Sequence, residues 1–345
     1  MKTGKVVVVG ATGMVGRILL GVMKKHRLKP MELVIVGSST VGKRKQTPYG
    51  SLKVQKMEMS VFDGAELAFF AAGAKVSKEW IPQLRGRNCR IIDLSSAFRY
   101  EPNVPLVIPS INGEAIGDSD LIACPNCTTS IALMVLEPIH SYFGIRRVYL
   151  ASYQAASGAG WQALQDLEMQ NRRWVRQGKP PKQGRTSATP LPLAGNLIPR
   201  IDILDSAWNG FTKEEMKTDW EANKILFIPH GGKEIPIIAT CVRVPVRRCH
   251  SEVLVIQTET KVTPEVLRQC LIFAFGVRVL DDPDNWVFPM PLNMEDREEV
   301  GVGRIRVIPD GEGREIVLWV CGDQLLRGAA LTAVEIAEYI LGKKF

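Results

Sequence analysis

The chain has no long apolar segment. None of its 345 residues lies in an apolar run that approaches the roughly 20 residues needed for a transmembrane helix. The start, MKTGKVVVVG, contains only four consecutive valines before a glycine, whereas a secretory signal needs an apolar stretch of about 7–15 residues. We therefore expect a cytoplasmic protein with no membrane partner.

A concentrated basic tract is also missing. The 44 Lys and Arg residues exceed the 36 Asp and Glu residues, which gives a net charge of +8, but the basic residues are scattered. This surplus favours anionic partners in general. Without a Lys/Arg block we expect small anionic molecules rather than nucleic acid.

The cysteine pattern lacks the features of a metal site or a disulfide framework. The seven cysteines are odd in number and the chain is not small, so we expect reduced thiols. Cys124 and Cys127 form a CxxC spacing, but neither a second such pair nor a nearby histidine pair completes a zinc site. We predict no metal.

Composition is that of a globular protein, with 46% hydrophobic and 23% charged residues, and the length fits two domains. In the first third, a helix over Val15–Lys25 is surrounded by predicted strands at Lys5–Val9, Glu32–Val36, Glu66–Ala71, Arg90–Leu94 and Leu121–Ala123. Strands that alternate with helices predict an α/β fold with a Rossmann-type, doubly wound parallel sheet.

The remainder has a different pattern. Further strands are predicted at Val148–Tyr153, Pro236–Val246, Ser251–Thr260, Gly303–Ile308 and Glu315–Cys321, with a helix over Trp161–Arg176 and a loop over Gly178–Pro192. The short link between the second and third of these strands favours a hairpin. We predict a nucleotide-binding domain over 1–126 and an α+β domain over 127–324. The final helix, Leu325–Leu341 within 325–345, is expected to pack back onto the first domain.

A glycine-rich turn, Gly10-Ala-Thr-Gly13-Met-Val-Gly16, follows the first predicted strand and opens a helix. Glycines in this context let the backbone approach a pyrophosphate at a helix N-terminus, which indicates a dinucleotide site. We assign to it Gly10, Thr12, Gly13, Met14, Val15 and Gly16.

The second predicted strand lacks an acidic residue at its end. An NAD enzyme usually places Asp or Glu there, about 20 residues after the glycines, to hold the ribose 2′-hydroxyl. This chain has Gly37-Ser-Ser-Thr-Val-Gly-Lys-Arg-Lys45 instead. The hydroxyls and cations favour NADP over NAD, with Ser38, Ser39 and Lys43 as contacts; the alternative is an ordinary basic surface loop.

The segment Ala123-Cys-Pro-Asn-Cys127-Thr-Thr-Ser130 follows a predicted strand and precedes a helical run. A cysteine at a helix N-terminus has a stabilised thiolate, so Cys127 is the candidate nucleophile. We expect Cys89, Cys124, Cys241, Cys270 and Cys321 to be ordinary buried cysteines. A nucleophilic cysteine needs a proton-transfer partner, and we prefer His250 to His26, His140 or His230.

The ordered motifs GATGMVG, PNCTT around Cys127, SYQAASGAG (Ser152–Gly160), EEMK (Glu214–Lys217), RVPV…HSE (Arg243–Glu252) and GDQLLRGAA (Gly322–Ala330) together resemble the aspartate-β-semialdehyde dehydrogenase family. The resemblance spans nearly the whole chain. It implies a Rossmann domain, a dimerising α+β domain, NADP as cofactor and a homodimer or a dimer of dimers.

The resemblance also implies residue roles. Cys127 would be the nucleophile, His250 the acid/base and Gln154 the residue that orients the reacting groups. The substrate contacts would be Arg243 to the α-carboxylate, Glu214 to the amine, and Lys217, Arg99 and Asn126 to the phosphate. Glu214 and Lys217 have an alternative as a surface i,i+3 ion pair. We add to the cofactor contacts Ala72, Gly73, Ser157, Gly158 and Gln324. The chain departs from the family pattern at Cys249, where a small residue is usual, and at Gln324, where Asn is common.

The resemblance implies NADPH-dependent reductive dephosphorylation of L-aspartyl-4-phosphate to L-aspartate-4-semialdehyde through a cysteine thioester. The pathway would be the biosynthesis of the aspartate-derived amino acids, namely Lys and diaminopimelate, Thr, Met and Ile. Two alternatives are an enzyme like N-acetyl-γ-glutamyl-phosphate reductase and a non-catalytic NADP-binding paralogue. In the former, Glu214 would have no substrate cation to meet.

Overall fold

The computed structural model describes residues 1–38, 40–181, 189–226, 234–309 and 312–345. The chain forms two compact units. The first comprises the described residues of Met1–Cys127, Lys224–Gly232 and Gly328–Phe345, and the second those of Thr128–Asn223 and Lys233–Arg327. The breaks after Cys127 and after Arg327 lie close to the predicted boundaries at 126/127 and 324/325, whereas the return of the chain to the first unit at Lys224 was not predicted.

The first unit is built on a seven-stranded sheet in the order β3-β4-β2-β1-β5-β6-β7. Its strands are β1 (Lys2–Val9), β2 (Lys29–Val36), β3 (Arg44–Thr47), β4 (Gly50–Gln55), β5 (Ala65–Phe70), β6 (Arg90–Asp93) and β7 (Leu121–Ala123). All neighbours pair in parallel except the β3–β4 hairpin. Without β3, this order is the 3-2-1-4-5-6 arrangement of dinucleotide-binding domains, so the predicted α/β fold is confirmed. β3 and β4 were not predicted from the sequence.

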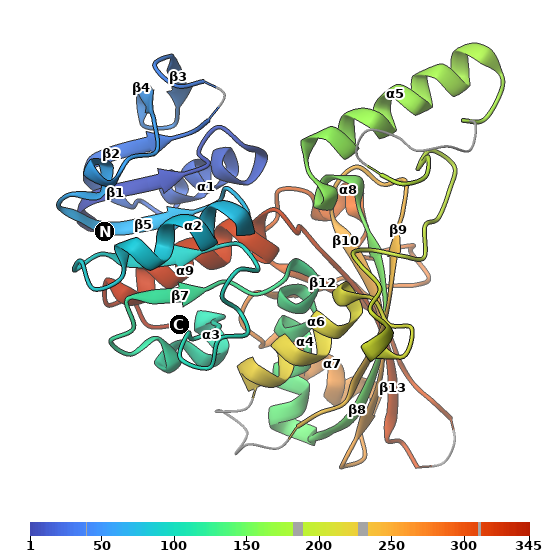
Figure 1. Cartoon of the computed structure of the whole chain (residues 1–345). Helices are drawn as coiled ribbons and strands as arrows, with labels where there is room; N and C mark the ends of the chain where they lie inside the picture. The colour runs from blue at the N-terminus through green and yellow to red at the C-terminus, as the bar shows by residue number, and fades with distance from the viewer. Residues whose placement is uncertain (39, 182–188, 227–233, 310–311) are drawn as a thin grey trace. The chain divides into compact units, whose positions relative to one another are not determined.

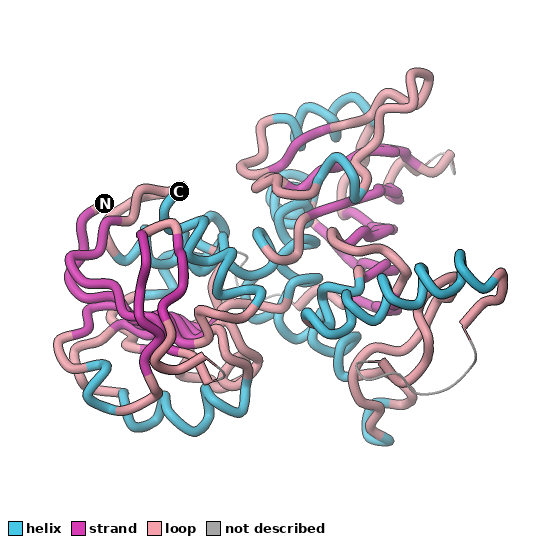
Figure 2. The backbone as a smooth tube through the Cα atoms, turned by 90° about the horizontal axis from the view of Figure 1, so that it is seen from above, coloured by secondary structure: helices cyan, strands magenta, loops and turns pink. Residues whose placement is uncertain are grey.

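Helices flank this sheet, as Figure 2 shows. They are α1 (Met14–Lys25), α2 (Ala74–Leu84), α3 (Pro109–Asn112) and α9 (Leu331–Ile340), with single 3₁₀ turns η1 (Met59–Phe62) and η2 (Gly113–Ile116). Val6–Val9 of β1 are at most 3% exposed, because a central parallel strand is covered on both faces. The C-terminal α9 packs against α1 and β6 of the same unit (Figure 1). The predicted final helix is in fact two elements, since η5 (Leu326–Ala330) is π-helical and precedes α9.

The second unit contains a six-stranded mixed sheet in the order β11-β12-β13-β10-β8-β9. Its strands are β8 (Ile145–Gln154), β9 (Ile237–Arg243), β10 (His250–Thr258), β11 (Val277–Val279), β12 (Val300–Val307) and β13 (Glu315–Gly322). The helical elements are α4 (Cys127–Phe143), η3 (Ala156–Ala159), α5 (Trp161–Gln177), η4 (Ser206–Trp208), α6 (Lys213–Leu226), α7 (Pro264–Ile272) and α8 (Pro291–Met294). Figure 1 shows α4, α6 and α7 on one face of this sheet. Part of the loop predicted over Gly178–Pro192 lies outside the described residues.

The predicted hairpin between the strands around 236–246 and 251–260 is wrong. β9 pairs with β8 in parallel, while β10 pairs with the opposite edge of β8 in antiparallel fashion, so β9 and β10 flank a common neighbour. The connecting residues pair with the chain just after β8, because Val246 and Arg247 accept hydrogen bonds from the backbone amides of Ala156 and Ser157. The short link between β9 and β10 therefore crosses over β8 instead of forming a hairpin.

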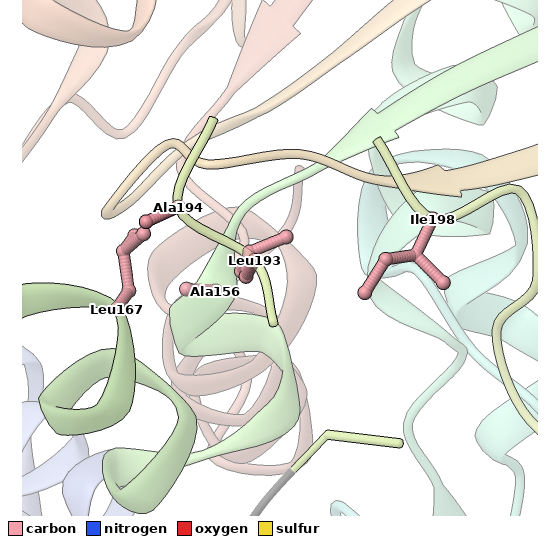
Figure 3. Packing of buried hydrophobic residues seen from close by; sticks show 5 residues of the cluster. All are labelled: Ala156, Leu167, Leu193, Ala194 and Ile198. Carbon is pink, nitrogen blue, oxygen red and sulfur yellow. The ribbon is translucent and has the colours of Figure 1, made fainter. Parts of the chain in front are cut away.

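A small apolar cluster fixes the segment that follows β8. Ala156, Leu167, Leu193, Ala194 and Ile198 are all buried and pack together, as the sticks in Figure 3 show. The backbone of Ile198 also exchanges two hydrogen bonds with Arg243, at 2.9 and 3.0 Å. The cluster thereby ties the end of β9 to the segment that leads on towards residue 202.

Candidate active site

The glycine-rich turn lies at the end of β1. Gly10 has a φ of +81°, and a Cβ there would lie 2.5 Å from the Ala71 carbonyl oxygen. A Cβ at Gly16 would lie 2.2 Å from the Gly10 oxygen, so neither position accepts a side chain without backbone movement. Helix α1 begins at Met14 with Gly13 as its N-cap, and its free N–H groups face the turn.

A second turn lies beside the first. Ala72 and Gly73 follow β5, the strand next to β1, and Gly73 is the N-cap of α2 with a φ of +86°. The strand order reverses between β1 and β5, and a ligand binds such a sheet at this switch point, beyond the carboxyl ends of the strands. The structure therefore brings Gly10, Ala72 and Gly73 together where a dinucleotide would be expected.

A cavity of about 310 Å³ adjoins the turn, and its lining includes Thr12, Arg17 and Lys45. Arg17 donates a hydrogen bond from Nε to the Thr12 carbonyl at 3.0 Å. Sequence reasoning missed Arg17, although its position one residue after Gly16 in a basic chain was a usable signal. Lys43 and Ser38 are exposed and do not line this cavity, and Ser39 lies outside the described residues.

Cys127 is the first residue of α4 and is partly exposed. Three residues earlier, the Cys124 carbonyl accepts a 2.8 Å hydrogen bond from Nε of Arg99. The side chains of Arg99 and Asn126 are both buried. The carbonyls of Arg99, Glu101 and Val104 in turn accept hydrogen bonds of 2.7–2.8 Å from the ammonium of Lys224. Lys224 thus braces the loop that carries Arg99.

The remaining cysteines differ from Cys127 in their surroundings. Five of them, Cys89, Cys124, Cys241, Cys249 and Cys321, are buried and no cysteine is in a disulfide. Burial raises the pKa of the Cys89 thiol to about 12 and raises the pKa of Cys124 and Cys241 further. Cys270 was expected to be buried but is only partly so; its Sγ lies 3.6 Å from the Pro138 carbonyl of α4, and burial raises its pKa to about 11.

In the second unit, three predicted site residues lie in one row across the sheet. Gln154 of β8 pairs with Arg243 of β9, and His250 of β10 comes one residue before Ser251, which pairs with Tyr153. The backbone of Ala155 connects them: its N–H donates to Nδ1 of His250 at 3.1 Å, and its carbonyl accepts from Nη1 of Arg243 at 2.7 Å.

The Ala155 hydrogen bond determines the tautomer of His250. A backbone N–H can only donate, so Nδ1 must be unprotonated and the proton of the neutral ring lies on Nε2. Nε2 is buried and has no hydrogen-bond partner among the described residues. Burial, helped by the charge of Arg243, holds the pKa of His250 well below its usual value, and a contact with the Cys249 backbone opposes this only in part.

Gly158 lies directly against this pair. A Cβ on Gly158 would lie 2.8 Å from Nη1 of Arg243 and 3.0 Å from Nε2 of His250. The glycine therefore leaves the approach to both donor groups open.

Glu214, Lys217 and Gln154 form a connected polar network. Nε2 of Gln154 donates to Oγ1 of Thr128 at 2.9 Å and to Oε1 of Glu214 at 3.3 Å. Lys217 donates to Oε2 of Glu214 at 3.0 Å, and both residues are buried rather than on the helix surface. Thr128 directly follows Cys127 in the chain, so Gln154 also orders the start of the nucleophile helix. Sequence reasoning missed a further member, Asp202, which binds Lys217 at 2.6 Å.

The C-terminal cofactor segment is joined to the turn before His250. Gln324 donates to Oγ of Ser157 at 2.6 Å and accepts from the Cys249 amide at 2.8 Å. Cys249 has a φ of +72°, in the left-handed region where a Cβ is unfavourable. A glycine, which has no Cβ, would adopt this backbone conformation without strain.

The predicted site residues are divided between the two units. In the first unit the glycine-rich turn, Ala72, Gly73, Arg99, Asn126 and Cys127 are placed, and in the second the network of Gln154, Arg243, His250, Glu214, Lys217, Ser157, Gly158 and Gln324. Among the described residues there is no cluster of three or more His, Cys, Asp or Glu that could hold a metal ion. In the same part of the chain, every helix is too short or too polar to span a membrane. His230 lies outside the described residues.

Comparison with known proteins gives matches over nearly the full chain. Residues 5–119 match the family described as semialdehyde dehydrogenase, NAD binding domain, and residues 136–327 match semialdehyde dehydrogenase, dimerisation domain. An aspartate-semialdehyde dehydrogenase of Aquifex aeolicus is 40% identical over 98% of both chains, and one of Synechocystis is 38% identical over 98% of this chain and 97% of its own. The crystal structure of aspartate semialdehyde dehydrogenase II from Vibrio cholerae matches with a TM-score of 0.90 at 33% identity over 99% of both chains, and a second structure of it is described as a complex with ASA.

Proposed function

Because the chain belongs to the aspartate-semialdehyde dehydrogenase family, we propose that it reduces L-aspartyl-4-phosphate to L-aspartate-4-semialdehyde and phosphate with NADPH. The reaction would serve the synthesis of the aspartate-derived amino acids. The observation that carries the proposal is the row of Arg243, Gln154 and His250 across three strands, joined through Ala155. This row offers a carboxylate-binding cation, an amide and a proton-bearing ring side by side.

We assign the chemical steps to the chain's own side chains as follows. The Cys127 thiolate attacks the acyl carbon, and the C–O bond to the phosphate breaks, which leaves a thioester on Cys127. NADPH, when bound, supplies the hydride for reduction of the thioester. Nε2–H of His250 donates a hydrogen bond to the substrate oxygen, which stabilises the negative charge on that oxygen until the aldehyde forms and the Cys127 thiolate departs. Helix-start N–H groups at Cys127 favour its thiolate form.

The remaining contacts would hold the substrate. Arg243 suits the α-carboxylate, because a guanidinium presents several donors in a planar fork, and the Ala155 carbonyl fixes the orientation of that fork through Nη1. Glu214 would bind the amine. Lys217, Arg99 and Asn126 would bind the phosphate. The relatives named above do not support the alternative of an N-acetyl-γ-glutamyl-phosphate reductase, whose substrate has no free amine, or that of a non-catalytic paralogue.

The first unit fits a dinucleotide, and we infer that it is the cofactor-binding domain and the second unit the substrate-binding domain. The pyrophosphate would bind at the glycine turn, where the free N–H groups of α1 lie at the switch point of the sheet. For the extra phosphate of NADP we propose Ser38, Ser39 and Lys43, together with Arg17 and Lys45 at the cavity.

We further infer a homodimer, or a dimer of dimers, that forms through the outward face of the second sheet. Ile238 and Tyr149 are about 40% exposed and lie in one row with Val255 and Val317. Figure 1 shows α4, α6 and α7 on the opposite face. Apolar side chains in such a row favour burial against a second copy, as the family's dimerisation domain implies. Seven cysteines without a disulfide fit the cytoplasm.

The test is phosphate-dependent reduction of NADP⁺ with aspartate semialdehyde, compared with N-acetylglutamate semialdehyde and with NAD⁺. We expect turnover only with the first aldehyde, a dependence on phosphate, and a preference for NADP⁺. Turnover with the acetylated aldehyde, or none with either, would exclude the proposed reaction.

A further inference from the structure

Lys217 is held by two carboxylates that differ in their surroundings. Its ammonium donates to Oδ2 of Asp202 at 2.6 Å and to Oε2 of Glu214 at 3.0 Å, and its side chain is 10% exposed. Burial would lower the pKa of Lys217, but Glu214 and Asp202 outweigh it and raise the pKa. The three side chains together carry a net charge of −1.

Glu214 is the fixed partner of the two. Its side chain is 7% exposed and lies one helical turn before Lys217 on α6. Its second oxygen, Oε1, accepts a hydrogen bond from Gln154, a buried residue of β8. A carboxylate held from both sides by a helix and a sheet has little freedom to leave.

Asp202 is the partner that can leave. Its side chain is 29% exposed and belongs to the irregular segment between Ile198 and η4. Its φ of +71° places it in the left-handed region, and among the described residues its other oxygen, Oδ1, accepts only from the amide of the next residue, Ile203. Burial acts to raise the pKa of Asp202, but Lys217 outweighs it, so the carboxylate is charged at neutral pH.

We propose that Asp202 is a displaceable counterion of the phosphate site. Its carboxylate forms an ion pair with the Lys217 ammonium until phosphate replaces it. This inference rests on the proposed role of Lys217. A phosphate dianion that approached the intact trio would meet a net negative charge. In this proposal the ion pair with Asp202 opens as phosphate binds, which removes that repulsion, and it re-forms when product phosphate leaves. Asp202 would thus set the affinity for phosphate and speed its release.

Asp202→Asn tests the proposal, because it removes the charge and keeps the shape. Asn retains an oxygen for the Ile203 amide and tolerates a positive φ. For a partly exposed ion pair we expect the KM for phosphate, measured with aspartate semialdehyde and NADP⁺, to fall about twofold to fivefold. The matched control is Asp205→Asn: Asp205 lies on the same segment and accepts from the Ala207 amide instead of a lysine. It should leave the KM unchanged.

A calorimetric titration with inorganic phosphate separates this inference from the proposed reaction, since it needs no turnover. Tighter phosphate binding by Asp202→Asn, with weaker binding by Lys217→Ala, supports the counterion even if the wild type does not turn over aspartate semialdehyde. Unchanged or weaker binding by Asp202→Asn, a matching change in Asp205→Asn, or unaltered binding by Lys217→Ala would each overturn it.

Discussion

Gly328 controls the position of the proposed nucleophile, and Gly328→Ala should impair it. Gly328 lies in the π-helical segment η5, and a Cβ there would lie 2.5 Å from Cβ and 2.8 Å from Cα of Cys127. The second of these atoms belongs to the backbone, so no side-chain rotation can relieve the contact.

The size of the effect follows from that overlap. Ordinary contact begins at 3.4 Å, so Cys127 and residue 328 must separate by about 1 Å. Overpacking of this kind costs typically about 1–3 kcal/mol of stability. A shift of about 1 Å at a reacting group can cost about 10²-fold in rate. We therefore expect Gly328→Ala to lower kcat by about one to two orders of magnitude and the melting temperature by a few degrees.

Two assays separate a displaced nucleophile from general destabilisation. Steady-state turnover is compared with the rate at which iodoacetamide alkylates Cys127, mapped by mass spectrometry, at a temperature where the variant is fully folded. Gly21→Ala is the control, because a methyl group there meets no atom within 4 Å and alanine favours a helix interior. If Gly328→Ala keeps wild-type turnover and an unchanged alkylation rate, the argument about Cys127 is wrong.

Three further predictions concern the nucleophile, the cofactor and the buried carboxyl. Cys127→Ser should fold and bind NADP but lose nearly all turnover, because a hydroxyl is a far weaker nucleophile; full activity would exclude a thioester. Arg17→Ala and Lys45→Ala should each weaken the binding of NADP more than the binding of NAD, as measured by fluorescence titration. Lys43→Ala is titrated in the same way for comparison. An equal loss of affinity for both cofactors would contradict a role in binding the 2′-phosphate. Burial raises the pKa of the Glu252 carboxyl well above the 4.5 that is usual for glutamate, and both its oxygens lack partners among the described residues. Protonation is therefore favoured in the folded state, and stability falls as pH rises above about 4.5 towards the folded pKa. In melting scans across pH, the stability of Glu252→Gln should not show this fall. If the stability of the wild type and that of Glu252→Gln change in parallel with pH, this role of Glu252 is refuted.

Local patterns in the sequence were sufficient where structure depends on near neighbours. The strand, glycine turn and helix around Gly10–Gly16 were predicted at the right place, because apolar period and glycine position are local signals. The same holds for the start of α4 at Cys127. The missing acid after β2 was likewise visible in the sequence alone.

Pairings between distant segments required the tertiary structure. A short link between β9 and β10 has the pattern of a hairpin, and only the sheet order reveals that β8 lies between them. The role of Lys224 as a brace for the Arg99 loop depends on contacts across more than 100 residues. No sequence period encodes such contacts.

The candidate site shows the same division. Residue types that suit the chemistry, such as Cys127, His250 and Arg243, could be chosen from motifs, since each sits beside recognisable local signals. Which nitrogen of His250 carries the proton depends on the Ala155 amide, 95 residues away in the chain. That Lys217 is shared between Glu214 and Asp202 likewise depends on a loop 15 residues distant. Sequence determined which groups are available, because side-chain chemistry is a property of each residue. Only the fold decided their charge states and partners, because these depend on what packing brings within hydrogen-bond distance.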